Sequence, residues 1–269
     1  MISRSDAKRE LERMRADPKP PVRRVVVVPG YRSHASLGRA LGDSLRSVVS
    51  VPDWVIDQAH QSSGTFEDAG ARVIGAIEEA WGTLDHEIDF VGVSMGGLLG
   101  RWLAMPEHGG LPIARLFTLS TPHRGANVAR IAAPDPAARL MVPGSDGLAM
   151  LDAALEDASY EMLCYARSRD WWVGTDRLAP EGVSPVTVTP PWWEPGHFMA
   201  SYDVRLIADV ARHVRGEAPL YDRQRPGESV SGSARLACSS VTVRVGRSIV
   251  AMVQPPLRPS PSTYNAPST

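Results

Sequence analysis

The sequence predicts an α/β protein with an open, mostly parallel sheet that is covered by helices on both faces. Between residues 23 and 217, short and nearly continuous apolar runs alternate with longer amphipathic segments. Such runs are typical of parallel strands buried on both faces, and the amphipathic segments between them are expected to form right-handed crossover helices. At 269 residues, the chain can form one large domain with short appendages.

Six apolar runs are expected to be strands, in chain order 24–28, 48–51, 88–93, 116–119, 162–166 and 186–189. Helical periodicity is found near residues 35–47, 65–82, 95–105, 146–155 and 200–215. In open sheets of this kind, ligands bind beyond the carboxyl ends of the strands. Functional residues are therefore expected in the loops after Val28, Val93, Ala166 and Thr189.

The two ends of the chain differ from this central zone. Residues 1–22 predict a charged helix, with Leu11 and Met14 about one turn apart, followed by a Pro-rich breaker run. Residues 218–269 are rich in Ser, Pro and Arg, which predicts a largely disordered tail. A small hairpin within residues 241–253 is the alternative, because polar and apolar residues alternate at its start.

The composition argues against several classes of protein. The 30 acidic and 29 basic residues give a net charge of −1, whereas nucleic acids and anionic membranes attract a basic surface. The two cysteines, Cys164 and Cys238, allow one disulfide at most, so a disulfide-framed scaffold is excluded. The amino terminus lacks the apolar segment of a secretory signal, and no apolar run of about 18 residues occurs. We expect a soluble, cytoplasmic protein without stable membrane insertion and without a nucleic-acid partner.

A G-x-S-x-G pattern follows the third expected strand. The segment Gly92-Val93-Ser94-Met95-Gly96 lies between an apolar strand and an amphipathic helix, which is the setting that a nucleophile elbow requires. The serine of such an elbow occupies a strained turn, and side chains two positions away would collide with a neighbouring strand or helix. We predict that Ser94 is a catalytic nucleophile rather than a small residue at a tight turn.

A serine hydroxyl needs a base to accept its proton and an acid to orient that base, in the chain order Ser, Asp or Glu, His. Among the histidines far enough after Ser94, His197 lies in a loop after the last strand, whereas His213 lies late in a helix. We predict His197 as the base. Asp170 is the first carboxylate after the fifth strand and is the predicted acid, with Asp176 further along the same loop as the alternative.

Attack of a serine on a carbonyl group also builds negative charge on the carbonyl oxygen, which preorganised N–H donors must stabilise. The backbone N–H of Met95, directly after the nucleophile, is one expected donor. The second is expected from the loop after the first strand, where Gly30 allows a close approach of the backbone and Tyr31 follows. The predicted oxyanion hole is therefore formed by Met95 and Tyr31.

With these motifs, residues 23–215 resemble the α/β-hydrolase superfamily, in particular its lipase-like and esterase-like members. Thr121-Pro122-His123-Arg124-Gly125 is similar to a T-P-H-x-G segment of such lipases, and Pro143-Gly144-Ser145 is similar to a segment near their lid. The chain departs from the family at Val93 and at Pro29-Gly30, where His and His-Gly are frequent. The resemblance implies an α/β-hydrolase fold with a reduced six-stranded sheet. The segment 126–160 is longer than a usual connection between strands and contains Ala- and Leu-rich helical stretches, so a small helical lid is expected there.

The motifs and the resemblance together predict a serine hydrolase that cleaves carboxylic esters through an acyl-enzyme intermediate. An acyltransferase, amidase or thioesterase with the same triad is the alternative among enzymes, and a non-catalytic binding protein is the alternative of another class. The sequence contains no CxxC pair, no paired histidines at ligand spacing and no phosphate-binding Gly-rich loop, so no cofactor and no metal are expected. The oligomeric state is left open.

The expected substrate is a small hydrophobic ester. Four tryptophans and one methionine lie in or beside the loops that carry the predicted acid and base, namely Trp171, Trp172, Trp192, Trp193 and Met199. Indole rings form rigid apolar walls, so these residues are predicted to line the substrate pocket. Together with the lid, they predict a preference for larger acyl or aromatic esters over acetate.

Overall fold

The structure is a computed structural model that describes residues 2–32, 35–57, 64–82, 84, 86–194 and 196–221. Its helices are α1 (Arg4–Ala16), α2 (Ala35–Arg46), α3 (Phe66–Trp81), α4 (Met95–Ala104), α5 (Pro136–Leu140), α6 (Asp146–Ala153) and α7 (Val204–Val214). Its strands are β1 (Arg24–Val28), β2 (Val55–Asp57), β3 (Ile88–Val93), β4 (Ile113–Leu119), β5 (Glu161–Arg167) and β6 (Val186–Val188). The tail from residue 222 onward, with the alternative hairpin at 241–253, lies outside the described residues.

Within the described residues, the strands form one parallel sheet with the order β2-β1-β3-β4-β5-β6, which confirms the predicted six-stranded architecture. From β1 the chain adds β2 on one side, and then adds β3 to β6 on the other side. The sheet therefore changes its direction of growth at β1. In such sheets a ligand crevice forms at this switch point, beyond the carboxyl ends of β1 and β3.

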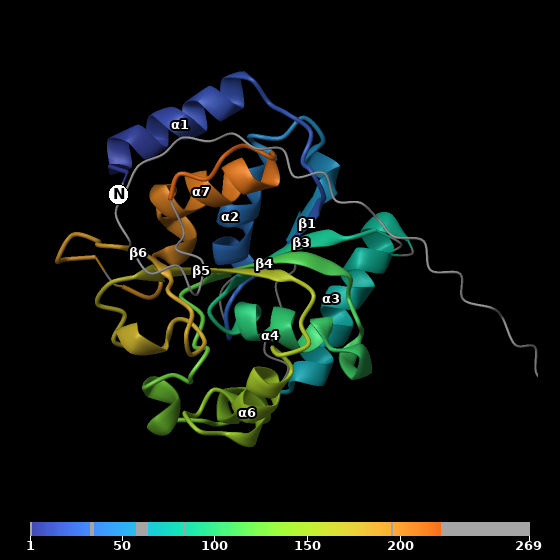
Figure 1. Cartoon of the computed structure of the whole chain (residues 1–269), viewed down its shortest axis with the longest axis vertical. Helices are drawn as coiled ribbons and strands as arrows, with labels where there is room; N and C mark the ends of the chain where they lie inside the picture. The colour runs from blue at the N-terminus through green and yellow to red at the C-terminus, as the bar shows by residue number, and fades with distance from the viewer. Residues whose placement is uncertain are drawn as a thin grey trace, which may run out of the picture. The chain divides into compact units, whose positions relative to one another are not determined.

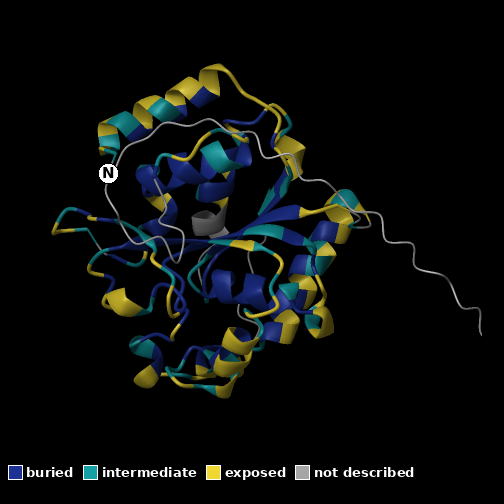
Figure 2. Ribbon diagram, in the orientation of Figure 1, coloured by how far each residue is buried: buried dark blue, intermediate teal, exposed yellow. Residues whose placement is uncertain are grey.

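Alternate residues of the strands face two helical layers, which lie on opposite sides of the sheet (Figure 1). Val26 and Val28 of β1 belong to a core with α3 and α4, whereas Val25 and Val27 belong to a second core with α1, α2 and α7. Figure 2 shows the strands largely buried between the layers and exposed residues on the outer side of α1. Burial on both faces explains why the strands are nearly continuous apolar runs.

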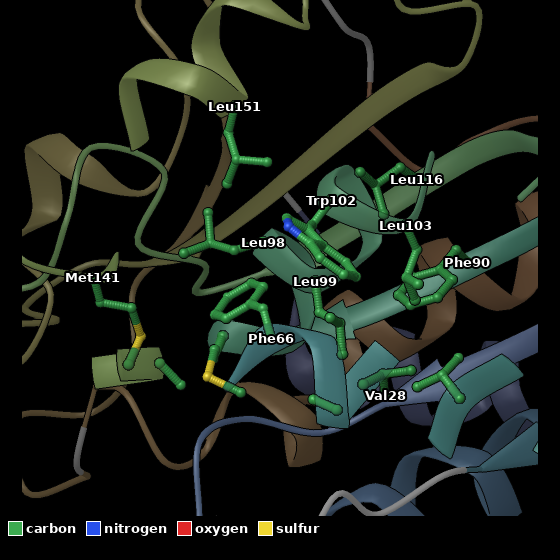
Figure 3. Close-up of a cluster of buried hydrophobic side chains, with 14 of the residues drawn as sticks. Val28, Phe66, Phe90, Leu98, Leu99, Trp102, Leu103, Leu116, Met141 and Leu151 are labelled. Atoms are coloured by element: carbon green, nitrogen blue, oxygen red, sulfur yellow. The ribbon is translucent and has the colours of Figure 1, made fainter. Parts of the chain in front are cut away.

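The segment 126–160, predicted as a lid, packs on the α3 and α4 side of the sheet. Figure 3 shows Met141 and Leu151 of this insertion directed toward Phe66 and Leu98, and all four side chains belong to one buried cluster. Burying an apolar side chain of this size contributes about 1.5–3 kcal/mol. The insertion is therefore anchored in the core.

The second strand differs from the prediction, because residues 48–51 do not form it. The strand is Val55–Asp57, which follows a short 3-10 turn. The N–H groups of Val48 and Val49 still bond to carbonyls in the last turn of α2. This apolar pair is therefore buried at the end of a helix. In the sequence, the short apolar run that contains it looks like a buried strand.

Both ends of the described chain pack against α7. Helix α1 buries Leu11 and Met14 in the same core as α7. After α7, the N–H of Leu220 donates to the carboxylate of Asp209 at 2.5 Å, and Tyr221 is buried. The packed body thus reaches residue 221, past the boundary expected at 217.

Candidate active site

Ser94 lies at the sharp turn between β3 and α4. Its backbone angles, φ 52° and ψ −123°, are outside the regions that residues with a side chain normally occupy. Such conformations cost about 1–3 kcal/mol and persist only where the surroundings enforce them. Here the N–H of Ser94 donates to the carbonyl of Leu119 on β4 at 2.8 Å, and α4 begins at the next residue. The turn places Ser94 at the carboxyl edge of the sheet.

Glycines leave the space that this turn needs. A Cβ atom on Gly92 would overlap the backbone of the first turn of α4, and a Cβ atom on Gly96 would overlap the carbonyl of Val28 in β1. A Cβ atom on Gly30, in the loop after β1, would lie 2.9 Å from that of Ser94. The close approach of β1, β3 and α4 therefore brings the β1 loop directly beside the serine, as expected for this pattern.

The structure brings Ser94, His197 and Asp170 together. Ser94 Oγ lies 3.0 Å from His197 Nε2, and His197 Nδ1 lies 2.9 Å from Asp170 Oδ2. A carboxylate can only accept hydrogen bonds, so this contact places the imidazole proton on Nδ1 and leaves Nε2 able to accept from the serine hydroxyl. This is the proton arrangement that a general base needs.

Asp170 is held firmly after the end of β5. The residue is fully buried, whereas the side chain of His197 is 13% exposed. Asp170 Oδ1 accepts from the N–H of Val173 at 3.1 Å, and the Asp170 carbonyl accepts from the N–H of Gly174 at 2.8 Å. Both carboxylate oxygens therefore have a partner, which a buried carboxylate requires.

The alternative acid and base lie elsewhere. The side chain of Asp176 is 73% exposed and approaches Arg177 at 3.8 Å. The ring of His213, on α7, meets Phe117 edge-on at 5.6 Å, and its Nε2 lies 3.8 Å from the carboxylate of Asp209. Phe117 belongs to the core on the α7 side of the sheet. The geometry therefore favours Asp170 over Asp176 as the acid, and His197 over His213 as the base.

Both residues predicted for the oxyanion hole lie beside the serine. Met95 is buried and begins α4, where the first N–H groups of a helix have no partner within it and the helix dipole favours negative charge. Tyr31 follows Gly30 in the loop after β1 and lines the same cavity as Ser94. The two residues flank Ser94 from the α4 side and from the β1 side.

The hydroxyl of Tyr31 connects the β1 loop with the insertion. It donates to Asp135 Oδ2 at 2.5 Å, and Arg32 Nη2 donates to the same oxygen at 3.1 Å. Asp135 also caps α5, because its Oδ1 accepts from the N–H of Ala138 at 2.9 Å. Burial and the adjacent Asp135 raise the pKa of Tyr31 to about 12, so the phenol keeps its proton at neutral pH. The insertion is thereby tied to the rim of the site.

A cavity of about 300 Å³ is bounded by Ser94 and His197. This volume is at the lower end of the range for small-molecule sites. Its walls are mostly apolar and come largely from the insertion. The lining residues are Tyr31, Ser94, Pro122, Ala126, Val128, Ala129, Ala132, Pro134, Ala138, Met141, Trp172, Val173, His197 and Phe198.

The five residues predicted to line the pocket lie in different environments. Trp172 lines the cavity. Trp171, Trp192 and Trp193 are 67%, 81% and 67% exposed, and neither they nor the half-buried Met199 are among the described residues that line it. The aromatic content of a loop does not reveal which side chains turn inward. The alanines that shape the cavity carry no charged or aromatic signal, which is why sequence reasoning missed them.

His123, from the T-P-H-x-G segment, is a buried structural residue. Its Nδ1 lies 3.2 Å from Arg101 Nη1, and its Nε2 lies 3.0 Å from Thr118 Oγ1. Burial, with the nearby charge of Arg101, holds the pKa of His123 well below its ordinary value.

Across the described residues, no group of His, Cys, Asp and Glu side chains is arranged to hold a metal ion. None of the helices in the described part of the chain has the length and apolar character to cross a membrane.

No protein-family model and no curated protein sequence matches this chain significantly, but solved structures do. The Bacillus licheniformis lipase BlEst2, in its propeptide form, aligns with a TM-score of 0.50 and 14% identity over 77% of this chain and 52% of its own. The Legionella pneumophila phospholipase PlaB aligns with a TM-score of 0.45 and 15% identity over 54% of this chain and 39% of its own. The RedJ thioesterase from the prodiginine pathway of Streptomyces coelicolor aligns with a TM-score of 0.43 and 20% identity over 73% of this chain and 93% of its own.

The match spans about half the length of the lipase chain and about two fifths of the phospholipase chain. At these identities, the likeness establishes the fold and nothing finer. The described residues have the α/β-hydrolase fold, which confirms the fold that the resemblance implied.

Proposed function

We propose that this protein is a serine hydrolase that cleaves carboxylic esters of hydrophobic acyl groups through an acyl-enzyme intermediate. One observation carries the proposal: Ser94 Oγ, the His197 ring and the Asp170 carboxylate are linked by contacts of 3.0 and 2.9 Å beside an apolar cavity. A fold does not imply a reaction, so the proposal rests on this site rather than on the structural neighbours.

In the acylation step, Ser94 Oγ attacks the ester carbonyl carbon while its proton passes to His197 Nε2. The buried carboxylate of Asp170 stabilises the imidazolium that forms. The carbonyl oxygen becomes an oxyanion, which accepts from the backbone N–H groups of Met95 and Tyr31. The tetrahedral intermediate then breaks its bond to the leaving oxygen, and His197 Nε2 gives the proton to the departing alcohol.

Deacylation repeats these steps with water as the nucleophile. His197 Nε2 accepts a proton from water as the water oxygen attacks the acyl carbon. The same N–H donors stabilise the second oxyanion. Breakage of the bond to Ser94 Oγ releases the carboxylic acid and returns the proton to the serine.

The cavity supports a hydrophobic acyl group as the part of the substrate that it binds. Each methylene moved from water into apolar surroundings contributes about 0.8 kcal/mol, which is roughly four-fold in binding. A volume of about 300 Å³ limits this gain, so specificity should rise with chain length and then level off.

Labelling with a fluorophosphonate probe tests the nucleophile directly, because the probe reacts with an activated serine whatever the natural ester. We expect a single modified residue, Ser94, identified by peptide mass spectrometry, and no labelling of Ser94→Ala. The exposed Ser50 provides the matched control, since Ser50→Ala should label at the parental rate. Labelling that persists in Ser94→Ala would refute the proposal.

A series of p-nitrophenyl esters from acetate to octanoate, assayed below micelle-forming concentrations, tests the acyl pocket. We expect kcat/KM to rise by about four-fold per added methylene until the cavity is filled. Ala129→Leu, which adds volume to the cavity wall, should lower kcat/KM for the longer esters and leave acetate little changed. A flat series would show that the cavity does not bind the acyl chain.

A further inference from the structure

The loop that carries His197 is closed at its base by one buried arginine. Arg167 is the last residue of β5, and its side chain is fully buried. Its Nη2 donates to Glu194 Oε2 at 2.5 Å, and its Nε lies 3.1 Å from Asp203 Oδ2. Glu194 and Asp203 stand on either side of His197 in the chain, so this guanidinium joins the two ends of the loop.

The same guanidinium also reaches the backbone next to His197. Arg167 Nη1 donates to the carbonyl of Gly196 at 3.2 Å, one residue before the histidine. Removing an arginine charge from water costs several kcal/mol unless it is paired and hydrogen-bonded. Here the two carboxylates balance the charge, and the planar guanidinium donates to Glu194 and to the Gly196 carbonyl while its Nε faces Asp203 as an ion pair. The loop and the arginine therefore constrain each other.

Helix α1 completes this network from the other end of the chain. Both Nη atoms of Arg4 donate to the carboxylate of Glu194, at 2.5 Å each. Hydrogen bonds from Arg4, and also from Arg167, hold the pKa of Glu194 below its ordinary value although burial opposes this. Asp203 is held in turn by Arg205, whose Nε and Nη2 donate to its carboxylate at 2.9 and 2.8 Å.

We propose that Arg167 and Arg4 are positioning residues for His197: acting through Glu194, Asp203 and the Gly196 carbonyl, they hold the His197 loop so that Nε2 stays within reach of Ser94 Oγ. The inference rests on the proposed role of His197 as the base. Neither arginine contacts the reacting atoms, so each acts on the rate through the backbone of the loop. A displacement of about 1 Å at a reacting group can cost up to about 100-fold in rate.

The first test uses Arg4, because its side chain is 38% exposed and its replacement should leave the protein folded. Arg9 on the same helix is the matched control, since its side chain is 69% exposed and pairs with Asp6. We expect Arg4→Ala to lower kcat for p-nitrophenyl butyrate by about three- to ten-fold, with KM changed by less than about two-fold. Arg9→Ala should keep the parental kcat, and Arg4→Lys should restore part of the loss.

Three results with Arg4 would overturn the inference. They are a parental kcat in Arg4→Ala, an equal loss of kcat in Arg9→Ala, and a loss that only follows the folded fraction measured by circular dichroism. A general weakening of helix α1 would give the second or third result. It would not give a specific fall in kcat that lysine partly rescues.

The second test uses Arg167→Lys, which keeps the charge but lacks the planar fork that reaches Glu194, the Gly196 carbonyl and Asp203 together. Where the variant folds, we expect a fall in kcat of about 10- to 100-fold and a parallel fall in the rate of fluorophosphonate labelling. A folded Arg167→Lys with parental rates would overturn the inference. If this variant does not fold, the Arg4 experiments decide alone.

A parallel assay of Ser94→Ala separates this inference from the proposed function. Esterase activity that survives in Ser94→Ala means that the proposed function is wrong, whatever the arginine variants do. Activity that is lost in Ser94→Ala but unchanged in Arg4→Ala and in Arg167→Lys means that the triad stands and the positioning role is wrong.

Discussion

The loop that holds Ser94 and the loop that holds His197 meet across 3.0 Å, yet different forces shape them. Ser94 is placed by close backbone packing, in which Gly92 and Gly96 of one short motif let β1, β3 and α4 close around a strained turn. The His197 loop is held by ion pairs between distant residues, such as Arg4 and Glu194, which are 190 positions apart. The position of Ser94 is therefore encoded in a short motif, whereas that of His197 depends on ion pairs between residues far apart in the chain.

The two kinds of support should respond differently to perturbation. Close backbone packing fails when volume is added, because the surrounding atoms cannot move without breaking the sheet. Ion pairs fail when a carboxylate is protonated, because the attraction then disappears.

Removing the proposed nucleophile should have the largest effect. We expect Ser94→Ala to lower kcat for p-nitrophenyl butyrate by on the order of 10³- to 10⁶-fold, since substrate binding and the oxyanion hole would still contribute. The far-UV circular dichroism spectrum should be unchanged. Hydrolysis at the parental rate would show that Ser94 is not the nucleophile.

Replacing the proposed acid tests whether His197 needs its carboxylate partner in the loop after β5. We expect Asp170→Asn to keep the fold and to lower kcat by on the order of 10⁴-fold, because an amide can favour the wrong imidazole tautomer. The exposed Asp176 is the matched control, and Asp176→Asn should retain nearly full activity. The reverse pattern in a steady-state assay would transfer the acid role to Asp176.

Adding a methyl group tests the packing around the elbow. A Cβ atom on Gly96 would overlap the carbonyl of Val28, so we expect Gly96→Ala to cost about 1–3 kcal/mol of unfolding free energy and to lower kcat. Gly75 on α3 has no atom within 4 Å of such a Cβ, and Gly75→Ala should instead stabilise the helix by about 0.5–1 kcal/mol. Urea unfolding measures both changes, and equal effects would contradict the packing account.

Lowering the pH tests the ion pairs of the base loop. Because the pKa of folded Glu194 lies below its ordinary value of 4.5, its ionisation stabilises the protein above that pH, and this contribution is lost as the pH falls through the lowered value. We expect Glu194→Gln to lower Tm by about 2–4 °C at pH 7 for each kcal/mol lost. The difference from the parental protein should shrink below about pH 4.5. A difference that thermal unfolding shows to be independent of pH would contradict this assignment.

The features of this protein that have a local signal could be predicted from the order of its residues. Apolar runs predicted five of the six strands, because a strand buried on both faces must be apolar along its length. The G-x-S-x-G pattern located the turn at Ser94 because Gly92 must leave room for the first turn of α4 and Gly96 must leave room for β1. Chain order then indicated His197 and Asp170, which the structure brings into contact with each other and with Ser94.

Other features depend on which distant groups meet, and these could be seen only in the folded chain. Val48 and Val49 have the residues of a strand, but the end of α2 keeps their N–H groups. Trp192 and Trp193 have the side chains of a pocket, but their loop turns them toward solvent, and small alanines from the insertion form the wall instead. Arg4 of α1 and Arg167 of β5 meet at Glu194 only once these elements have come together in the folded chain. The physical reason is that burial and ion pairing depend on distances in space, which residues far apart in sequence acquire only when the chain folds.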